Sequence, residues 1–247
     1  MSQSTAGLNG AVGLITGGVS GIGAAITAEL RGRGATVVAV DRYAQPASAA
    51  AAPESAPAQP TREVAGDVRD FTAMAAISDR VHAEFGRLDF IVANAGITDW
   101  GLMSTGDPER WHDVIDTNVL GVAHTIRAAL PVLVAQGHGH VVITASISGR
   151  TTYVGEPIYI ATKWALVGLG GALRKEVGPA GVRVSLIEPG IVNTPLVQNT
   201  AEGAAELAAA RPLDPEDIAR AVAFVLEQPA HVNIDEIVIS PLAQQFS

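Results

Sequence analysis

The chain has 247 residues, 48% of them hydrophobic, a formal net charge of -9 and no cysteine. This composition predicts one large α/β domain over residues 1–247 and excludes disulfides, thiolate metal sites and cysteine nucleophiles. The negative charge argues against nucleic acid or an anionic membrane as the main partner. Without a long apolar run or a charged start ahead of one, we expect no membrane span and no secretory signal, hence a cytoplasmic protein.

The first elements form a strand, a glycine-rich turn, a helix and a second strand. Residues 11–16 are an apolar run, residues 16–23 read T-G-G-V-S-G-I-G, residues 24–33 have helical composition, and residues 36–40 are β-branched and end at Asp41. The glycines allow a tight turn and let the backbone approach a pyrophosphate at a helix N-terminus. Asp41 stands where a carboxylate would accept hydrogen bonds from an adenosine ribose. The alternative is a glycine-rich turn beside a solvated aspartate.

The spacing T-G-x-x-x-G-x-G resembles the fingerprint of the short-chain dehydrogenase/reductase family. This resemblance implies a single Rossmann-type, doubly wound α/β domain, with about seven parallel strands in the order 3-2-1-4-5-6-7 and helices on both faces. It also implies that the turn binds NAD(P), through Gly17, Ser20, Gly21, Ile22 and Gly23.

The choice of cofactor depends on the residues after the second strand. Asp41 should repel a 2′-phosphate, and Val19 in the glycine turn is not basic, so both favour NAD over NADP. Arg42 could pair with a phosphate, or it could be solvated. We predict NAD, with Arg42 and Asp41 both at the adenosine end.

The next segment, residues 44–60, consists mainly of alanine, proline, serine and glutamine, which predicts a surface loop rather than a helix. A strand over residues 63–65 and a helix over 70–86 follow. The resemblance places Asp67 and Val68 against the adenine ring. After another apolar strand, residues 88–93, it assigns Asn94, Ala95 and Gly96 to the cofactor site.

A helix is predicted over residues 107–135, beginning with Asp107, a proline and an acid. It contains Asn118, which matches the family's N-x-x-G segment and is implied to support a water chain to the catalytic lysine; an ordinary helical asparagine is the alternative. His138 and His140 flank a glycine without a third ligand at matching spacing, so a turn is expected there and no metal site.

Tyr159 and Lys163 lie four residues apart, on one face of a helix predicted over residues 157–177. A fixed ammonium near a phenol would lower the phenol pKa from about 10 and let it exchange protons with a ketone or alcohol. The family places its catalytic serine thirteen residues before its tyrosine, which selects Ser146, after a strand over residues 141–145.

The resemblance gives each of these residues a role. Ser146 would bind the substrate oxygen, Tyr159 would exchange the proton and Lys163 would bind the nicotinamide ribose. Ser148 is expected in the wall of the substrate pocket. Tyr153 is set aside as the catalytic tyrosine because a proline, not a lysine, follows it four residues later.

Three interior glycines of the same helix, Gly168, Gly170 and Gly171, predict close contact with another helix. Because family members pack this helix against neighbouring subunits, we expect a homo-oligomer, a tetramer or else a dimer.

After a strand over residues 182–187, the motif P-G-x-x-x-T implies contacts to the nicotinamide from Pro189, Gly190, Ile191 and Thr194. Residues 195–212 are expected to form a mostly apolar substrate loop. A helix over residues 214–227 and a strand over 234–240 complete the pattern. The ending S-P-L-A-Q departs from the family's glycine-rich turn and leaves the substrate range open.

These residues predict an NAD-dependent oxidoreductase acting on a secondary alcohol or ketone of small to medium size. The alternative is a non-catalytic dinucleotide sensor on the same fold, although a sensor need not keep the serine, tyrosine and lysine together.

Overall fold

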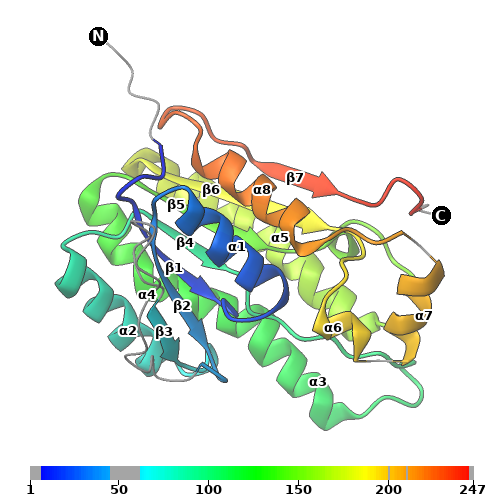
Figure 1. The fold of residues 1–247 in the computed structure, drawn as a ribbon. Helices are drawn as coiled ribbons and strands as arrows, with labels where there is room; N and C mark the ends of the chain where they lie inside the picture. Colours follow the sequence, from blue (N-terminus) through cyan, green and yellow to red (C-terminus); the bar gives the residue numbers. More distant parts are fainter. Residues whose placement is uncertain (1–6, 45–61, 200, 210, 245–247) are drawn as a thin grey trace.

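The computed structural model describes residues 7–44, 62–199, 201–209 and 211–244. Seven parallel strands form one sheet in the order β3-β2-β1-β4-β5-β6-β7, as the sequence predicted (Figure 1). The strands are β1 (Val12–Thr16), β2 (Thr36–Asp41), β3 (Arg62–Ala65), β4 (Phe90–Ala93), β5 (Gly139–Thr144), β6 (Val182–Pro189) and β7 (Glu236–Ile239).

Helices cover both faces of this sheet. They are α1 (Gly21–Gly32), α2 (Phe71–Phe85), α3 (Pro108–Ile115), α4 (Gly121–Gln136), α5 (Pro157–Val177), α6 (Pro195–Gln198), α7 (Ala201–Ala209) and α8 (Pro215–Leu226). Buried residues of α2, α4 and α5 pack on one face of the sheet, and those of α1 and α8 pack on the other.

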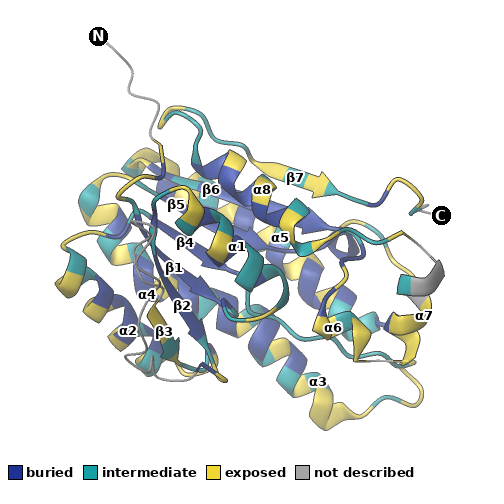
Figure 2. Ribbon diagram, viewed as in Figure 1, coloured by how far each residue is buried: buried dark blue, intermediate teal, exposed yellow. Residues whose placement is uncertain are grey.

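The strands are apolar on both sides because both sides are covered. Leu14 and Ile91 belong to one hydrophobic cluster, whereas their neighbours Ile15 and Val92 belong to the other. Figure 2 shows the inner strands β2, β1, β4, β5 and β6 as largely buried, the edge strands β3 and β7 as more exposed, and the outward surfaces of the helices as exposed. This arrangement leaves the carboxyl ends of the strands as the edge where a ligand can bind.

The helix starts follow from local side-chain chemistry. Asp70 accepts a hydrogen bond from the Ala73 backbone N–H, Asp107 accepts one from Glu109 N–H, and Asp214 and Asp217 form a capping box. Such caps satisfy backbone donors that have no partner in the first turn.

The long helix predicted over residues 107–135 is not uniform. A π-helical turn, Asp116–Leu120, separates α3 from α4. The whole stretch, Pro108–Gln136, is the one helix of the described ranges that is long and apolar enough to cross a membrane by length and composition. In this fold α4 instead packs on the sheet, and its Val122, Ile126 and Leu133 belong to the core.

Two expectations are corrected. The substrate loop predicted over residues 195–212 contains the helices α6 and α7, because Pro195 can occupy a first helical turn and alanines favour the helix that follows. The glycines of α5 do not all meet another helix: a Cβ at Gly170 would lie 2.6 Å from Leu186 of β6, so this glycine lets the helix approach the sheet. A Cβ at Gly168 or Gly171 would have no atom within 4 Å. The surface loop expected over residues 44–60 lies, beyond Ala44, outside the described residues.

Candidate active site

A cavity of about 900 Å³ lies along the carboxyl ends of the strands. Its walls come from the residues that follow β1, β2, β3, β4, β5 and β6, together with α5 and α6. The sheet order changes direction at β1, since β2 lies on one side of it and β4 on the other. Such a crevice is where open α/β sheets bind their ligands.

Most of the predicted site residues line this one cavity. They are Gly17, Ser20, Gly21, Ile22, Asp41, Arg42, Asp67, Val68, Asn94, Ala95, Gly96, Ser146, Ser148, Tyr159, Lys163, Pro189, Gly190, Ile191 and Thr194. Gly23 and Asn118 are not part of its lining, and the structure gives each a supporting role.

The glycine turn connects β1 to α1 through a backbone that other residues would strain. Gly17 has a φ of 65°, and its N–H donates to the Val40 carbonyl at 2.8 Å. A Cβ at Gly23 would lie 1.9 Å from the Gly17 carbonyl oxygen and 2.7 Å from the amide nitrogen of Asn94. Gly23 therefore allows the helix to pack directly against the turn, so that the helix N-terminus faces the cavity.

Acidic and basic side chains surround the end of the cavity formed by β2 and β3. Asp41 accepts a hydrogen bond from the Tyr43 backbone N–H at 3.0 Å, and Arg42 lies over the Tyr43 ring. Hydrogen bonds from Arg69 lower the pKa of Asp67. This end thus offers carboxylates as acceptors for hydroxyl donors.

The segment after β4 is tied to the glycine turn. The Asn94 side chain donates to the carbonyl oxygens of Thr16 at 3.2 Å and Gly17 at 3.3 Å. Asn118, which is fully buried in the π-helical turn, bonds both the N–H and the carbonyl of Ile97 at 2.8 Å. Asn118 therefore fixes the cavity wall after β4 and does not itself face the cavity.

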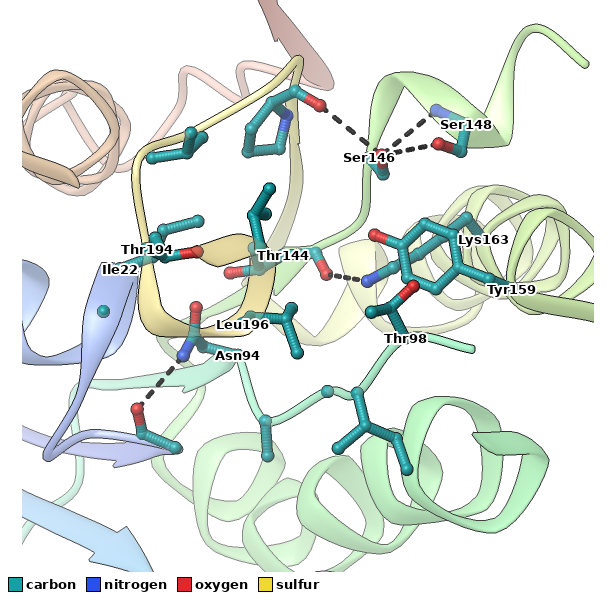
Figure 3. A pocket seen from close by; sticks show the side chains of 18 of the residues that line it. Ile22, Asn94, Thr98, Thr144, Ser146, Ser148, Tyr159, Lys163, Thr194 and Leu196 are labelled. Atoms are coloured by element: carbon teal, nitrogen blue, oxygen red, sulfur yellow. Dashed lines mark hydrogen bonds between the residues drawn. The ribbon is translucent and has the colours of Figure 1, made fainter. Parts of the chain in front are cut away.

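The serine, tyrosine and lysine converge from two elements (Figure 3). Ser146 follows β5, while Tyr159 and Lys163 are on α5, where Pro157 occupies the first turn. The Lys163 ammonium donates to the Thr144 carbonyl at 3.2 Å, and its nitrogen lies 5.4 Å from the centre of the Tyr159 ring. Tyr159 and Lys163, which are four residues apart on α5, thus face the same cavity.

The expected fall in the Tyr159 pKa is wrong for this structure. Burial of the phenol raises the Tyr159 pKa above 10, and the charge of Glu156 raises it further, while a hydrogen bond with Ser146 acts in the opposite direction. Burial also lowers the pKa of Lys163 to about 8. The physical reason is that desolvation disfavours the charged form of both groups.

Three polar residues of the cavity wall were not among the sequence predictions for the site. Glu156, only 3% exposed, accepts hydrogen bonds from the hydroxyls of Tyr153 and Thr98. Tyr153 in turn contacts the Ser148 hydroxyl at 2.8 Å. An acid directly before the proline that opens α5 was a visible signal for Glu156, but Thr98 is brought here only by the fold.

The other end of the wall is formed by the residues after β6. The Ile191 backbone N–H donates to the side-chain oxygen of Gln244 at 3.1 Å, and Thr194 is 5% exposed. Gln244 belongs to the ending that departs from the family pattern. Its side-chain oxygen therefore accepts from the Ile191 N–H, which is the backbone donor that the family resemblance assigns to the nicotinamide.

Together, a glycine backbone at a helix N-terminus, carboxylates after β2 and β3, and a Ser–Tyr–Lys group after β5 fit the two ends of a nicotinamide dinucleotide. The glycine turn at the helix N-terminus suits the phosphates, and the carboxylates suit ribose hydroxyls. The Ser–Tyr–Lys group suits a carbonyl beside the nicotinamide. This combination defines a dinucleotide-binding α/β oxidoreductase site.

Comparison with known proteins identifies the family. Residues 11–205 match the family described as short chain dehydrogenase. An uncharacterized oxidoreductase of Staphylococcus saprophyticus is 37% identical over 176 residues, which cover 71% of this chain and 73% of that protein. The chain belongs to the short-chain dehydrogenase/reductase family, and it is an oxidoreductase whose fold binds a nicotinamide cofactor.

Solved structures agree with this assignment. Levodione reductase is 30% identical with a TM-score of 0.83, and the match covers 94% of this chain and 96% of that one. A metagenomic short-chain oxidoreductase in complex with NADP is 29% identical with a TM-score of 0.78, covering 96% and 99% of the two chains.

Proposed function

We propose that this protein is an NAD-dependent oxidoreductase that transfers a hydride between the nicotinamide and a secondary alcohol or ketone of small to medium size. The observation that carries this proposal is the shared cavity: Ser146, Tyr159 and Lys163 line the same crevice as the glycine turn after β1. A redox cofactor and a proton donor can therefore act on one bound carbonyl.

The side chains divide the chemistry between them. Ser146 donates a hydrogen bond to the substrate oxygen, where negative charge grows during reduction. Because its pKa is raised, Tyr159 keeps its proton at neutral pH and can give it to that oxygen. The bound nicotinamide supplies or accepts the hydride. Lys163 lines the same cavity and would bind the ribose hydroxyls of the cofactor, so that the nicotinamide ring is held beside the substrate.

Asp41 supports NAD as the preferred cofactor. Its carboxylate lines the cavity at the end of β2, where it would accept hydrogen bonds from ribose hydroxyls and would repel a 2′-phosphate. One structural neighbour was solved in complex with NADP. In this chain, Arg42 is a cation near Asp41 that could pair with the 2′-phosphate of NADP. A direct comparison of the two cofactors is therefore part of the test.

A substrate would bind beside Ser146, in the part of the cavity that the segment containing α6 also lines. Leu196 and Val197 from this segment line the cavity and supply apolar surface.

We also infer a homo-oligomer, a tetramer or a dimer, since Trp164 on α5 is 49% exposed beside the open glycines at 168 and 171. A cytoplasmic location is consistent with the lack of cysteine.

The decisive experiment compares the wild type with Tyr159→Phe on panels of ketones and secondary alcohols, with NADH and NADPH in parallel. Loss of the proton donor should reduce kcat by about 10²–10⁴-fold while the Kd for NADH stays within a fewfold of the wild-type value. NADH binding by a wild type that turns over no carbonyl or alcohol would instead favour the dinucleotide sensor.

A further inference from the structure

A continuous chain of hydroxyl groups leads from the catalytic serine to a buried carboxylate. The Ser146 hydroxyl lies 3.1 Å from the Ser148 hydroxyl, which lies 2.8 Å from the Tyr153 oxygen. Tyr153 donates to Glu156 Oε2 at 2.7 Å. Ser146, Ser148 and Glu156 are each less than 9% exposed, so both ends of this chain are buried, whereas Tyr153 between them is 39% exposed.

The carboxylate at the end fixes the direction of every donor in the chain. An ionised carboxylate only accepts hydrogen bonds, so the Tyr153 proton points to Glu156. The Tyr153 oxygen then accepts the Ser148 proton, and the Ser148 oxygen is left to accept from Ser146. The Ser148 backbone N–H meanwhile donates to the Ser146 oxygen at 3.1 Å. In the ligand-free protein the Ser146 proton therefore points to Ser148, and a substrate oxygen can accept this proton only by replacing Ser148 as the acceptor.

Glu156 also fixes the wall on which this chain lies. Its Oε1 accepts the Thr98 hydroxyl from the segment after β4, and its carbonyl accepts the Ile160 N–H in the first turn of α5. The neighbouring Gly155 carbonyl accepts the Gly101 N–H at 2.6 Å. Two segments that are distant in sequence are thus joined at Glu156.

We propose that Glu156 is a positioning residue which, through Tyr153 and Ser148, holds the Ser146 hydroxyl in place, so that the hydroxyl can turn its proton from Ser148 to the substrate oxygen when a substrate binds. This inference rests on the proposed function, because only a carbonyl or alcohol bound at Ser146 uses that donor. It adds a negatively charged group that the serine, tyrosine and lysine do not themselves provide.

The charge of Glu156 has a second, measurable effect. The titratable groups around the Tyr159 phenol are Lys163 from α5, Glu156 and Tyr153 from the segment before α5, and Arg110 from α3, which lines the same cavity. Of these, Glu156 opposes ionisation of the phenol and, after burial, raises the Tyr159 pKa. Removing its charge should lower the pKa of Tyr159.

The first test measures carbonyl reduction against pH for Glu156→Gln and Tyr153→Phe. Reduction requires protonated Tyr159, so its rate falls as the pH rises through the Tyr159 pKa. In Glu156→Gln we expect kcat to fall about tenfold and this falling limb to move to lower pH, because the chain loses its fixed direction and the phenol loses a nearby negative charge. Tyr153→Phe should lower kcat similarly but leave the limb nearer its wild-type position, since Glu156 keeps its charge.

The matched control is Glu176→Gln, which removes the same charge from an exposed position near the end of α5. This control should behave as the wild type does. If the wild type turns over carbonyls and Glu156→Gln matches Glu176→Gln in kcat and in pH profile, the inference is overturned while the proposed function stands.

A second measurement does not need turnover. The chain contains three tyrosines, Tyr43, Tyr153 and Tyr159, so ¹³C-labelled tyrosine ring carbons can be assigned by single Tyr→Phe variants and titrated by NMR. Tyr159 should ionise at lower pH in Glu156→Gln than in the wild type, and unchanged titration would overturn the inference. A wild type without any turnover would instead remove the proposed function, and the catalytic role of Glu156 with it.

Discussion

The ammonium of Lys163 lies 5.4 Å from the centre of the Tyr159 ring and donates its hydrogen bond to the Thr144 carbonyl, at 3.2 Å. The lysine thus lies beside the tyrosine but is anchored to the end of β5. Burial acts on the two groups in opposite directions, raising the pKa of Tyr159 and lowering that of Lys163 to about 8. In the ligand-free protein the phenol therefore holds its proton tightly, and the amine holds its own loosely.

The Lys163 pKa predicts a pH dependence of cofactor binding. Below pH 8 the side chain is mostly the ammonium, which can donate to ribose hydroxyls and attract the anionic cofactor. The affinity for NADH should fall severalfold as the pH rises through about 8 to 9.5, as followed by fluorescence titration. Lys163→Met should bind more weakly at pH 7 and lose this dependence, whereas Lys175→Met, which removes the other lysine, should retain it. A Lys163→Met variant with the wild-type dependence would contradict the assignment.

Asp41 is expected to set the preference between NAD and NADP. In Asp41→Asn the repulsion of a 2′-phosphate is removed while Arg42 remains, so the Kd for NADPH should tighten about tenfold and the Kd for NADH should weaken. Isothermal titration with both cofactors measures the ratio. Asp79→Asn, on the exposed side of α2, removes an equal charge outside the cavity and should leave the ratio unchanged. An unchanged ratio in Asp41→Asn would show that other residues select the cofactor.

Gly23 and Gly32 lie at opposite ends of α1 and provide a matched pair. Gly23→Ala places a methyl group 1.9 Å from the Gly17 carbonyl oxygen, so it should reduce the free energy of unfolding by about 1–3 kcal/mol and weaken NADH binding. At Gly32 an added Cβ meets no atom within 4 Å, so Gly32→Ala should leave stability unchanged or raise it by up to about 1 kcal/mol. Urea denaturation of both variants tests this, and equal effects would refute the packing argument.

Gln244 occupies a backbone donor that the proposed cofactor site needs. If the nicotinamide carboxamide binds the Ile191 N–H, the Gln244 side chain must first leave it. Gln244→Ala should therefore tighten NADH binding by about two- to tenfold, the equivalent of one hydrogen bond. Gln228→Ala, which removes a glutamine that follows α8, serves as the control. Weaker binding by Gln244→Ala would mean that this side chain holds the cofactor instead.

The exposed face of α5 predicts the site of self-association. Trp164, Gly168 and Gly171 follow the helical repeat and lie on one side of the helix. Trp164→Glu should convert a larger species to a monomer in light scattering at micromolar concentration, because a buried charge in an interface is costly. Ala76→Glu on the exposed side of α2 should not change the mass. A wild type of monomer mass would refute the oligomer outright.

The order of the strands and most of the predicted residues that line the cavity could be obtained from the sequence by itself. Apolar runs separated by helical repeats give a parallel α/β sheet, and the glycine, Ser–Tyr–Lys and P-G-x-x-x-T motifs select residues whose spacing is local. Chain connectivity determines such features, because a turn or two residues four apart on a helix need no distant partner.

The tertiary structure alone decided the electrostatics and the contacts between distant segments. Burial reversed the expected direction of the Tyr159 pKa. Gly170 of α5, which the sequence predicted to contact another helix, instead packs against Leu186 of β6. The Thr98–Glu156 contact joins residues 58 positions apart. Desolvation and hydrogen bonding depend on what surrounds a group in space, and that surrounding is complete only once the whole chain has folded.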